Sequence, residues 1–207
     1  NIIIICMSDK QMYFWGEPDT TVHFCENKYN VFSWVAEYDN TFSAIPYILL
    51  GLGFRKSKIK NIGNALILLG ISTMMMHGTL RFYGQWMDEC SLFYLSFESI
   101  RHLKKNVSYI YFLSLITLYF YFRDNYLYFL STFISLQLII VYLVIQLKKS
   151  LLQKICISLY IATFILATVF WILDQKICNA ENYFPYHALW HFLTALAMFY
   201  GFTSFVI

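Results

Sequence analysis

The chain has 207 residues, of which 59% are hydrophobic, 20% are aromatic and only 13% are charged. Soluble domains have about 25% charged residues, so this composition excludes a soluble globular domain and predicts an all-α protein with several membrane spans. The formal net charge of +3 is small. Because the cationic residues lie in short connections and do not gather in one patch, we expect no nucleic-acid partner.

Residues 1–36 form a polar, aromatic segment that precedes the first long apolar stretch. We call it the N-terminal segment. It is too short to fold alone, and we expect it to pack across the lumenal mouth of a helix bundle. The chain opens on Asn1, and we expect its natural start at Met7 or Met12. Residues 1–6 would then lie outside the fold.

Seven apolar stretches follow, each of about 17–22 residues, the length needed to cross about 30 Å of hydrocarbon. The period-2 alternation of a membrane barrel is absent, and the sequence contains no repeat and no linker. The predicted fold is therefore a seven-transmembrane-helix bundle that forms a single domain over residues 1–207. The expected helices cover 37–54, 62–82, 88–103, 106–122, 126–147, 155–174 and 186–206.

Basic residues concentrate in alternate connections between these helices. The connections RKSKIK, RHLKK and KKSLLQK follow the first, third and fifth helices, and they hold four, three and three of the fifteen lysines and arginines. Short basic connections stay on the cytosolic side of a membrane. This pattern predicts a lumenal N-terminus and a cytosolic C-terminus.

Three of the five histidines fall at the lumenal depth of the expected helices. His77 lies late in the second helix, and His187 and His191 open the seventh. The spacing of four puts His187 and His191 on one helical face, an arrangement in which two imidazoles bind one divalent ion. A third histidine leaves a tetrahedral metal one open position for water, as catalytic zinc sites require. The three residues together predict a metal site, for which the pair alone would be weak support.

Two other polar residues lie near these histidines. Asp88 opens the third expected helix eleven residues after His77, across a lumenal turn, and can therefore face the same cavity. Its alternative role is that of an N-cap or first-turn acid that the helix dipole favours. Thr73 lies four residues before His77 on the same face. Its alternative role is a hydrogen bond back to the helix backbone.

Together these positions resemble the signature of a known superfamily. A hydroxyl residue four positions before a histidine, an aspartate at the head of the next helix and HxxxH opening the seventh are typical of the alkaline ceramidase-like membrane hydrolases, which also include adiponectin and progestin receptors. The alkaline ceramidases are the most similar members. The segments that resemble their sequence blocks, in family order, are FWGEPDTTVHFCENKYN, WVAEYDNTFS, HGTLRFYGQWMDE, FWILDQKIC and HALWHFLT. The fourth and fifth helices carry no resemblance beyond hydrophobicity.

The resemblance implies an intramembrane zinc-dependent amidohydrolase that cleaves ceramides to a sphingoid base and a fatty acid. In such an enzyme His77, His187 and His191 would bind zinc, with a water in the fourth position. Asp88 would act as general acid and base, and the hydroxyl of Thr73 would stabilise the oxyanion. The family has serine at position 73, and threonine fixes the hydroxyl rotamer more tightly, so we expect reduced activity that is not lost.

The family's N-terminal block also builds a calcium site. Glu26 and Glu37 match ligand positions, whereas His23 stands where an aspartate is expected and Lys28 where an asparagine is. An ammonium group is unfavourable among calcium ligands, so we expect calcium not to bind as it does in relatives. Lys28 could instead take the cation's place and pair with Glu26 and Glu37, or these acids are solvated.

In the family a disulfide joins the positions of Cys25 and Cys178. Both residues lie outside the cytosol in the predicted topology, where a disulfide can persist. The five cysteines make an odd count, so at least one is unpaired. Cys90 and Cys156 fall within expected helices as small apolar residues, and Cys6 precedes the expected start.

Two other interpretations stay open. The first is another enzyme of the superfamily that acts on a different lipid amide or ester. The second is a heptahelical receptor or transporter whose histidines bind a metal structurally or relay protons. A transporter would be expected to show discontinuous helices and repeat symmetry, which the sequence lacks. The resemblance further implies an endoplasmic reticulum or Golgi membrane, a ceramide-type lipid as the bound substrate, and no obligate protein partner.

Overall fold

Helices make up the regular structure of the protein in a computed structural model that describes residues 13–146, 150–178 and 183–207. No strand occurs in these residues, which confirms the all-α prediction. The helices are α1 (Tyr38–Phe42), α2 (Ile45–Phe54), α3 (Lys60–Thr79), α4 (Phe82–Leu103), α5 (Tyr109–Tyr121), α6 (Tyr126–Gln146), α7 (Leu151–Lys176) and α8 (Tyr186–Val206).

Four of the described helices, α3, α6, α7 and α8, are long and apolar enough to cross a membrane. They support the predicted integral membrane protein. Helix α5 is apolar but has only 13 residues. Helix α4 has 22 residues but carries Asp88, Glu89 and Glu98 in its buried face. The number of spans and the direction of the termini stay predictions.

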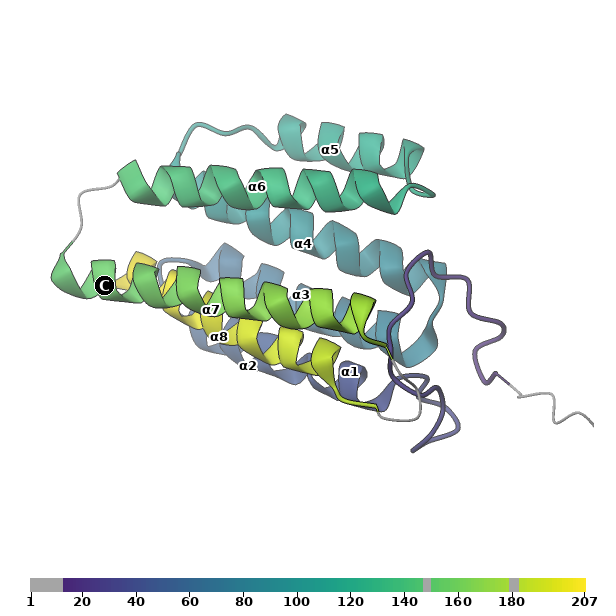
Figure 1. Ribbon diagram of the computed structural model, residues 1–207. Helices are drawn as coiled ribbons and strands as arrows, with labels where there is room; N and C mark the ends of the chain where they lie inside the picture. Colours follow the sequence, from purple (N-terminus) through teal and green to yellow (C-terminus); the bar gives the residue numbers. More distant parts are fainter. Residues whose placement is uncertain (1–12, 147–149, 179–182) are drawn as a thin grey trace, which may run out of the picture.

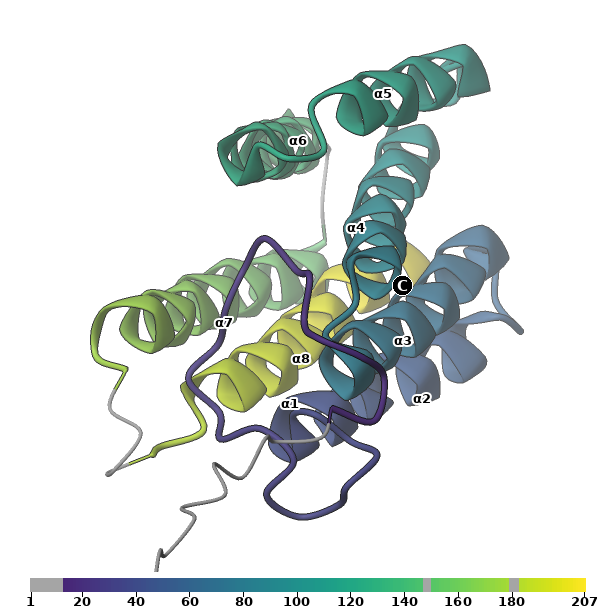
Figure 2. The same cartoon turned by 90° about the vertical axis from the view of Figure 1, so that its right-hand side faces the viewer.

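The helices form a bundle with the N-terminal segment at one end and the C-terminus at the opposite end (Figure 1). Helix α3 packs against α2 and α4, and α7 packs against α8. Helices α5 and α6 lie together on one side of the bundle, where α4 connects them to the other helices (Figure 2). The main apolar core lies between α2, α3 and α8 and includes Tyr47, Leu66 and Phe202.

Close backbone contact between α2 and α3 depends on glycine. A Cβ atom on Gly51 would lie 2.6 Å from the carbonyl oxygen of Gly63, and one on Gly63 would lie 2.7 Å from the backbone nitrogen of Arg55. Glycine therefore lets the two backbones touch, as small residues commonly do between membrane helices.

The first expected helix, 37–54, is two helices in the structure. Helix α1 ends with the N–H of Ser43 donating to the carbonyl of Asp39, and α2 starts two residues later with proline in its first turn. Pro46 has no backbone N–H to donate, so it fits the start of a helix and not its interior. The prediction of one continuous helix was wrong for this reason.

Helix α4 begins six residues before the expected start at Asp88. Its first turn packs against the last turn of α3, because a Cβ on Gly84 would lie 2.8 Å from the Cα of Met76. The N–H of Phe82, the first residue of α4, donates to the side chain of Asp19 in the N-terminal segment. Asp88 consequently lies in the second turn of α4 and is not its N-cap.

The described part of the N-terminal segment crosses the ends of α3 and α4. Its Ala36 N–H donates to the carbonyl of Gly78 at 2.9 Å, and the N–H of Glu37 donates to the carbonyl of His77 at 3.0 Å. Asp19 forms an ion pair with Arg81 at 2.9 Å. These contacts fix the segment over the end of the bundle that holds the histidines.

Candidate metal centre

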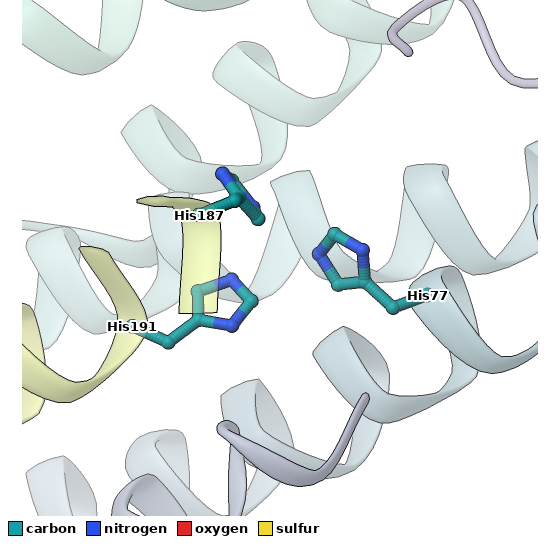
Figure 3. A group of neighbouring side chains, drawn as sticks. All are labelled: His77, His187 and His191. Carbon is teal, nitrogen blue, oxygen red and sulfur yellow. The ribbon is translucent and has the colours of Figure 1, made fainter. Parts of the chain in front are cut away.

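Three buried histidines meet at this end of the bundle, and we call them the histidine cluster. His77 comes from the last turns of α3, and His187 and His191 come from the first turns of α8. They are 1%, 4% and 4% exposed. Their rings point toward one another (Figure 3), and one ligand nitrogen from each lies within 4.8 Å of the others. Two imidazole nitrogens on a tetrahedral zinc are about 3.4 Å apart, so small side-chain shifts would close the site.

Hydrogen bonds to the outer ring nitrogens orient two of the three imidazoles. Nδ1 of His77 lies 2.6 Å from Oε2 of Glu37, and Nδ1 of His191 lies 2.8 Å from Oγ of Ser43. Metal-binding histidines usually have such a partner on the nitrogen that does not bind the metal. The hydrogen bonds occupy Nδ1 and so leave Nε2 available to a metal in both residues.

His187 differs from the other two. Its Nδ1 atom is buried and has no hydrogen-bond partner among the described residues. A buried polar atom without a partner costs about 1–3 kcal/mol, and coordination of a metal would satisfy it. The ring of Phe24, from the N-terminal segment, lies 3.9 Å from the His187 ring and 4.8 Å from the His77 ring. The donor set and its burial fit a metal ion.

Asp88 and Thr73 lie beside the histidine cluster. Both side chains are buried, and the Thr73 hydroxyl is within hydrogen-bond distance of Oδ1 of Asp88 and of the carbonyl of Leu69, the latter at 2.8 Å. The bond back to Leu69 is the alternative role that the sequence allowed. Because a hydroxyl has one proton, Thr73 donates to one of these acceptors at a time.

A cavity of about 430 Å³ adjoins the histidine cluster. Its volume falls in the range of ligand pockets, about 300–1,000 Å³. All three histidines and Asp88 line it, together with apolar side chains of α6 and α7. Aromatic residues among these side chains include Phe129, Phe133, Phe164 and Trp171. The arrangement places candidate catalytic groups next to space for an apolar ligand.

A second buried acid, Glu89, also lines this cavity. Gln85 donates to its Oε1 at 2.7 Å, and the hydroxyl of Tyr119 on α5 donates to its Oε2 at 2.5 Å. Gln85 also accepts from the N–H of Thr21 at 2.7 Å. These bonds connect α4 to α5 and to the N-terminal segment. No sequence pattern predicted them.

The expected calcium ligands Glu26 and Glu37 have other partners. Glu26 accepts from the N–H groups of Asp39 and Asn40 at 2.6 and 2.9 Å, and burial raises the pKa of its carboxyl to about 7. Lys28 forms an ion pair with Glu37 and donates to the carbonyl of Phe24.

These contacts do not fit a calcium site, because an ammonium group and backbone N–H groups lie where a hard cation needs oxygen ligands. They also differ in detail from the predicted pairing of Lys28 with both acids. Among the described residues, Lys28 pairs with Glu37, whereas Glu26 bonds to the backbone at the start of α1.

A disulfide joins Cys25 of the N-terminal segment to Cys178 after α7, with their Cα atoms 5.2 Å apart. It connects the segment that carries Phe24 to the connection that follows α7. Cys90 and Cys156 are free thiols on α4 and α7. Cys6, Met7 and Met12 lie outside the described residues.

Sequence reasoning missed the partners of the candidate metal ligands. It assigned Glu37 to a calcium site and gave Ser43 no role, yet these residues bond to His77 and His191. The paired residues are 40 and 148 positions apart in the chain. A glutamate and a serine at the start of an apolar helix give no sequence signal for such contacts.

Comparison with known proteins gives consistent matches. The ceramidase family model matches residues 16–207. An alkaline ceramidase of Arabidopsis thaliana is 26% identical over 212 residues, which cover 89% of this chain and 82% of that protein. Alkaline ceramidase 1 of Homo sapiens is 27% identical over 212 residues, with 87% and 79% covered. An alkaline ceramidase of Saccharomyces cerevisiae is 32% identical over 88 residues, which cover 39% of this chain and 28% of that protein.

Proposed function

The chain belongs to the ceramidase family, and on that premise we propose that it is an intramembrane zinc-dependent amidohydrolase that cleaves ceramides to a sphingoid base and a free fatty acid. One observation carries the proposal: three buried histidines line a cavity of about 430 Å³ whose walls are mainly apolar. Metal ligands and space for hydrocarbon chains occur together there, as hydrolysis of a lipid amide requires.

We assign zinc to His77, His187 and His191, because a set of three imidazoles suits zinc and leaves one position open. Zinc in such a site supplies Lewis acidity and makes water a stronger acid. Glu37 and Ser43 hold the rings of His77 and His191 through their Nδ1 atoms. Their part is to orient the ligands and to select the tautomer with a free Nε2.

Asp88 is the proposed general acid and base. Its carboxylate accepts a proton from the attacking water and returns it to the amine nitrogen as the carbon–nitrogen bond of the amide breaks. The hydroxyl of Thr73, which bonds to Asp88, is proposed to donate to the carbonyl oxygen as negative charge develops there. Asp88 and Thr73 are both buried beside the histidine cluster, so bulk water does not compete for these contacts.

The proposed topology has seven membrane spans in a single domain over residues 1–207, with the N-terminal segment in the lumen and the C-terminus in the cytosol. Two observations support it. The N-terminal segment and the C-terminus lie at opposite ends of the bundle (Figure 1), and Cys25 and Cys178 form a disulfide, a bond that persists outside the cytosol. We propose the endoplasmic reticulum or Golgi membrane as the location.

Purified protein in detergent micelles, supplied with zinc, tests the proposal. We expect it to release a sphingoid base and a fatty acid from ceramide faster than it hydrolyses a lipid ester of the same acyl length. His191→Ala, prepared in parallel, should show neither product. Preferred hydrolysis of the ester would favour the related enzyme class. A wild-type protein that binds zinc but turns over no lipid amide would favour a receptor-like function.

A further inference from the structure

An ion pair between Lys28 and Glu37 contacts the histidine cluster through His77. Glu37 is 0% exposed, and the side chain of Lys28 is 25% exposed. The two carboxylate oxygens of Glu37 have different partners: Oε1 accepts from Nζ of Lys28, and Oε2 lies 2.6 Å from Nδ1 of His77. One carboxylate thus connects an ammonium group to a candidate metal ligand.

The ion pair balances charge without involving the imidazole. A buried carboxylate is costly unless a cation pairs with it, and Lys28 is the cation that contacts Glu37. When the Nδ1–H of His77 donates to Glu37, the lone pair on Nε2 is left for a metal. The carboxylate therefore fixes both the orientation of the His77 ring and the nitrogen that can bind the metal.

Further contacts fix this arrangement in space. Nδ2 of Asn40 donates to Oε2 of Glu37 at 3.1 Å, so three side chains hold the carboxylate. Nζ of Lys28 also donates to the carbonyl of Phe24 at 2.8 Å. The ring of Phe24 lies against His187 and His77. Lys28 thus contacts both the backbone of Phe24, whose ring packs on the histidine cluster, and Glu37, the acid that orients His77.

We propose that Lys28 is a positioning residue of the metal centre, which acts through Glu37 to hold the ring of His77 oriented for metal binding. A cation that is covalently part of the N-terminal segment then sets the metal affinity of a site formed by α3 and α8. The inference rests on the proposed function, because it requires that His77 bind a metal. Lys28 acts on the metal site indirectly, through Glu37.

A purely structural role for Lys28 makes a different prediction. If Lys28 only anchors the N-terminal segment, its loss lowers stability but leaves the metal affinity of the folded protein unchanged. Its effect would also be independent of the residue at position 37. Metal affinity and its dependence on Glu37 are therefore the measurements that separate the two roles.

Zinc affinity, measured by competition with a chromogenic chelator on the purified full chain at fixed pH, tests the proposal. We expect Lys28→Met to bind zinc about tenfold more weakly, and Glu37→Gln about 10–100-fold more weakly, the usual range for outer partners of metal ligands. Lys28→Arg, which keeps the charge, should retain most of the affinity. Lys176→Met is the control, because Lys176 is exposed at the end of α7, and it should bind zinc like the wild type.

The double variant Lys28→Met/Glu37→Gln tests the route through the carboxylate. Glutamine is neutral and can still accept from His77, so adding Lys28→Met to it should cause no further loss of zinc affinity. This comparison also serves if Lys28→Met alone does not fold, because the double variant leaves neither charge unpaired. A further tenfold loss in the double variant would show that Lys28 does not act through Glu37.

Two other outcomes would overturn the inference. Wild-type zinc affinity in folded, disulfide-bonded Lys28→Met would overturn it alone and leave the proposed function intact. A wild-type chain that binds no zinc would overturn the inference and the proposed function together.

Discussion

Helices α3 and α7 are both long and apolar enough to cross a membrane, but 67% of the membrane-length window of α3 is buried and only 11% of that of α7. Helix α3 packs between α2 and α4 and has Thr73 and His77 among its buried residues. Helix α7 packs on α8 and forms one wall of the cavity. The more buried helix thus carries polar groups of the candidate site, and the more exposed helix contributes to the wall of the cavity.

The physical reason is the absence of water at membrane depth. A polar group there must find a protein partner, and close helix contacts supply partners, as between Ser72 on α3 and Ser91 on α4 at 2.9 Å. Helices α6 and α7 expose mainly apolar side chains, which lipid tolerates without partners. We therefore expect substitutions on the α3 side to change the chemistry and substitutions on α7 to change which lipid fits.

The largest effect is expected for Asp88→Asn on the packed side. Asparagine keeps the shape and can still accept from Thr73, but it cannot accept the proton of the attacking water. Ceramide hydrolysis should fall about 10³–10⁴-fold with the zinc content unchanged. The measurement is the initial rate of sphingoid-base release, with zinc determined on the same preparation. A folded, zinc-loaded variant within tenfold of the wild-type rate would remove Asp88 from the mechanism.

Thr73 should have the next largest effect. Thr73→Val has a similar shape but no hydroxyl, so it loses the contact with Asp88 and the proposed contact with the oxyanion. We expect turnover to fall about 10²–10³-fold. Thr73→Ser is the matched control and should keep or raise turnover, because it restores the hydroxyl with more rotamer freedom. Equal rates for Thr73→Val and the wild type would contradict this role.

Substitutions on α7 should change substrate specificity and leave the chemical step intact. Ile161 lines the cavity, whereas Leu166 on the same helix does not line it and is 48% exposed. Ile161→Trp should fill part of the cavity and lower kcat/KM for a long-chain ceramide about tenfold relative to a short-chain one. Leu166→Trp adds the same bulk outside the cavity and should leave that ratio unchanged. The same ratio in both variants would mean that the cavity does not bind the acyl chain.

Calcium removal is expected to have the smallest effect. The ammonium of Lys28 and the backbone of α1 already hold Glu37 and Glu26, the two expected calcium ligands. With zinc supplied, the hydrolysis rate should be the same in calcium-free buffer and in added calcium. A rate that rises steeply with calcium would show that the cation displaces Lys28.

The sequence predicted the long apolar helices well and their starts less well. The last helix begins at Tyr186 as expected, directly after its N-cap residue Pro185. The predicted start of α4 at residue 88 was wrong, because the composition of RFYGQWMD is typical of a turn. Only the structure shows that Gly84 lets this stretch wind as a helix against Met76.

The same limit applies to the candidate site. The HxxxH motif predicts that His187 and His191 lie together, because the helical period puts both residues on one face. The depth of His77 follows from the length of its helix. The bonds from Glu37 to His77 and from Ser43 to His191 depend on how α1 packs on α3 and α8. Helix packing of this kind leaves no periodic pattern in the chain.

We propose above all that His77, His187 and His191 bind one catalytic zinc. The most direct test measures zinc content and ceramide hydrolysis on the same purified preparations of wild type and His77→Ala. We expect stoichiometric zinc and sphingoid-base release in the wild type, and neither in His77→Ala that is inserted in the membrane and has formed the Cys25–Cys178 disulfide. Stoichiometric zinc retained by His77→Ala would contradict the claim.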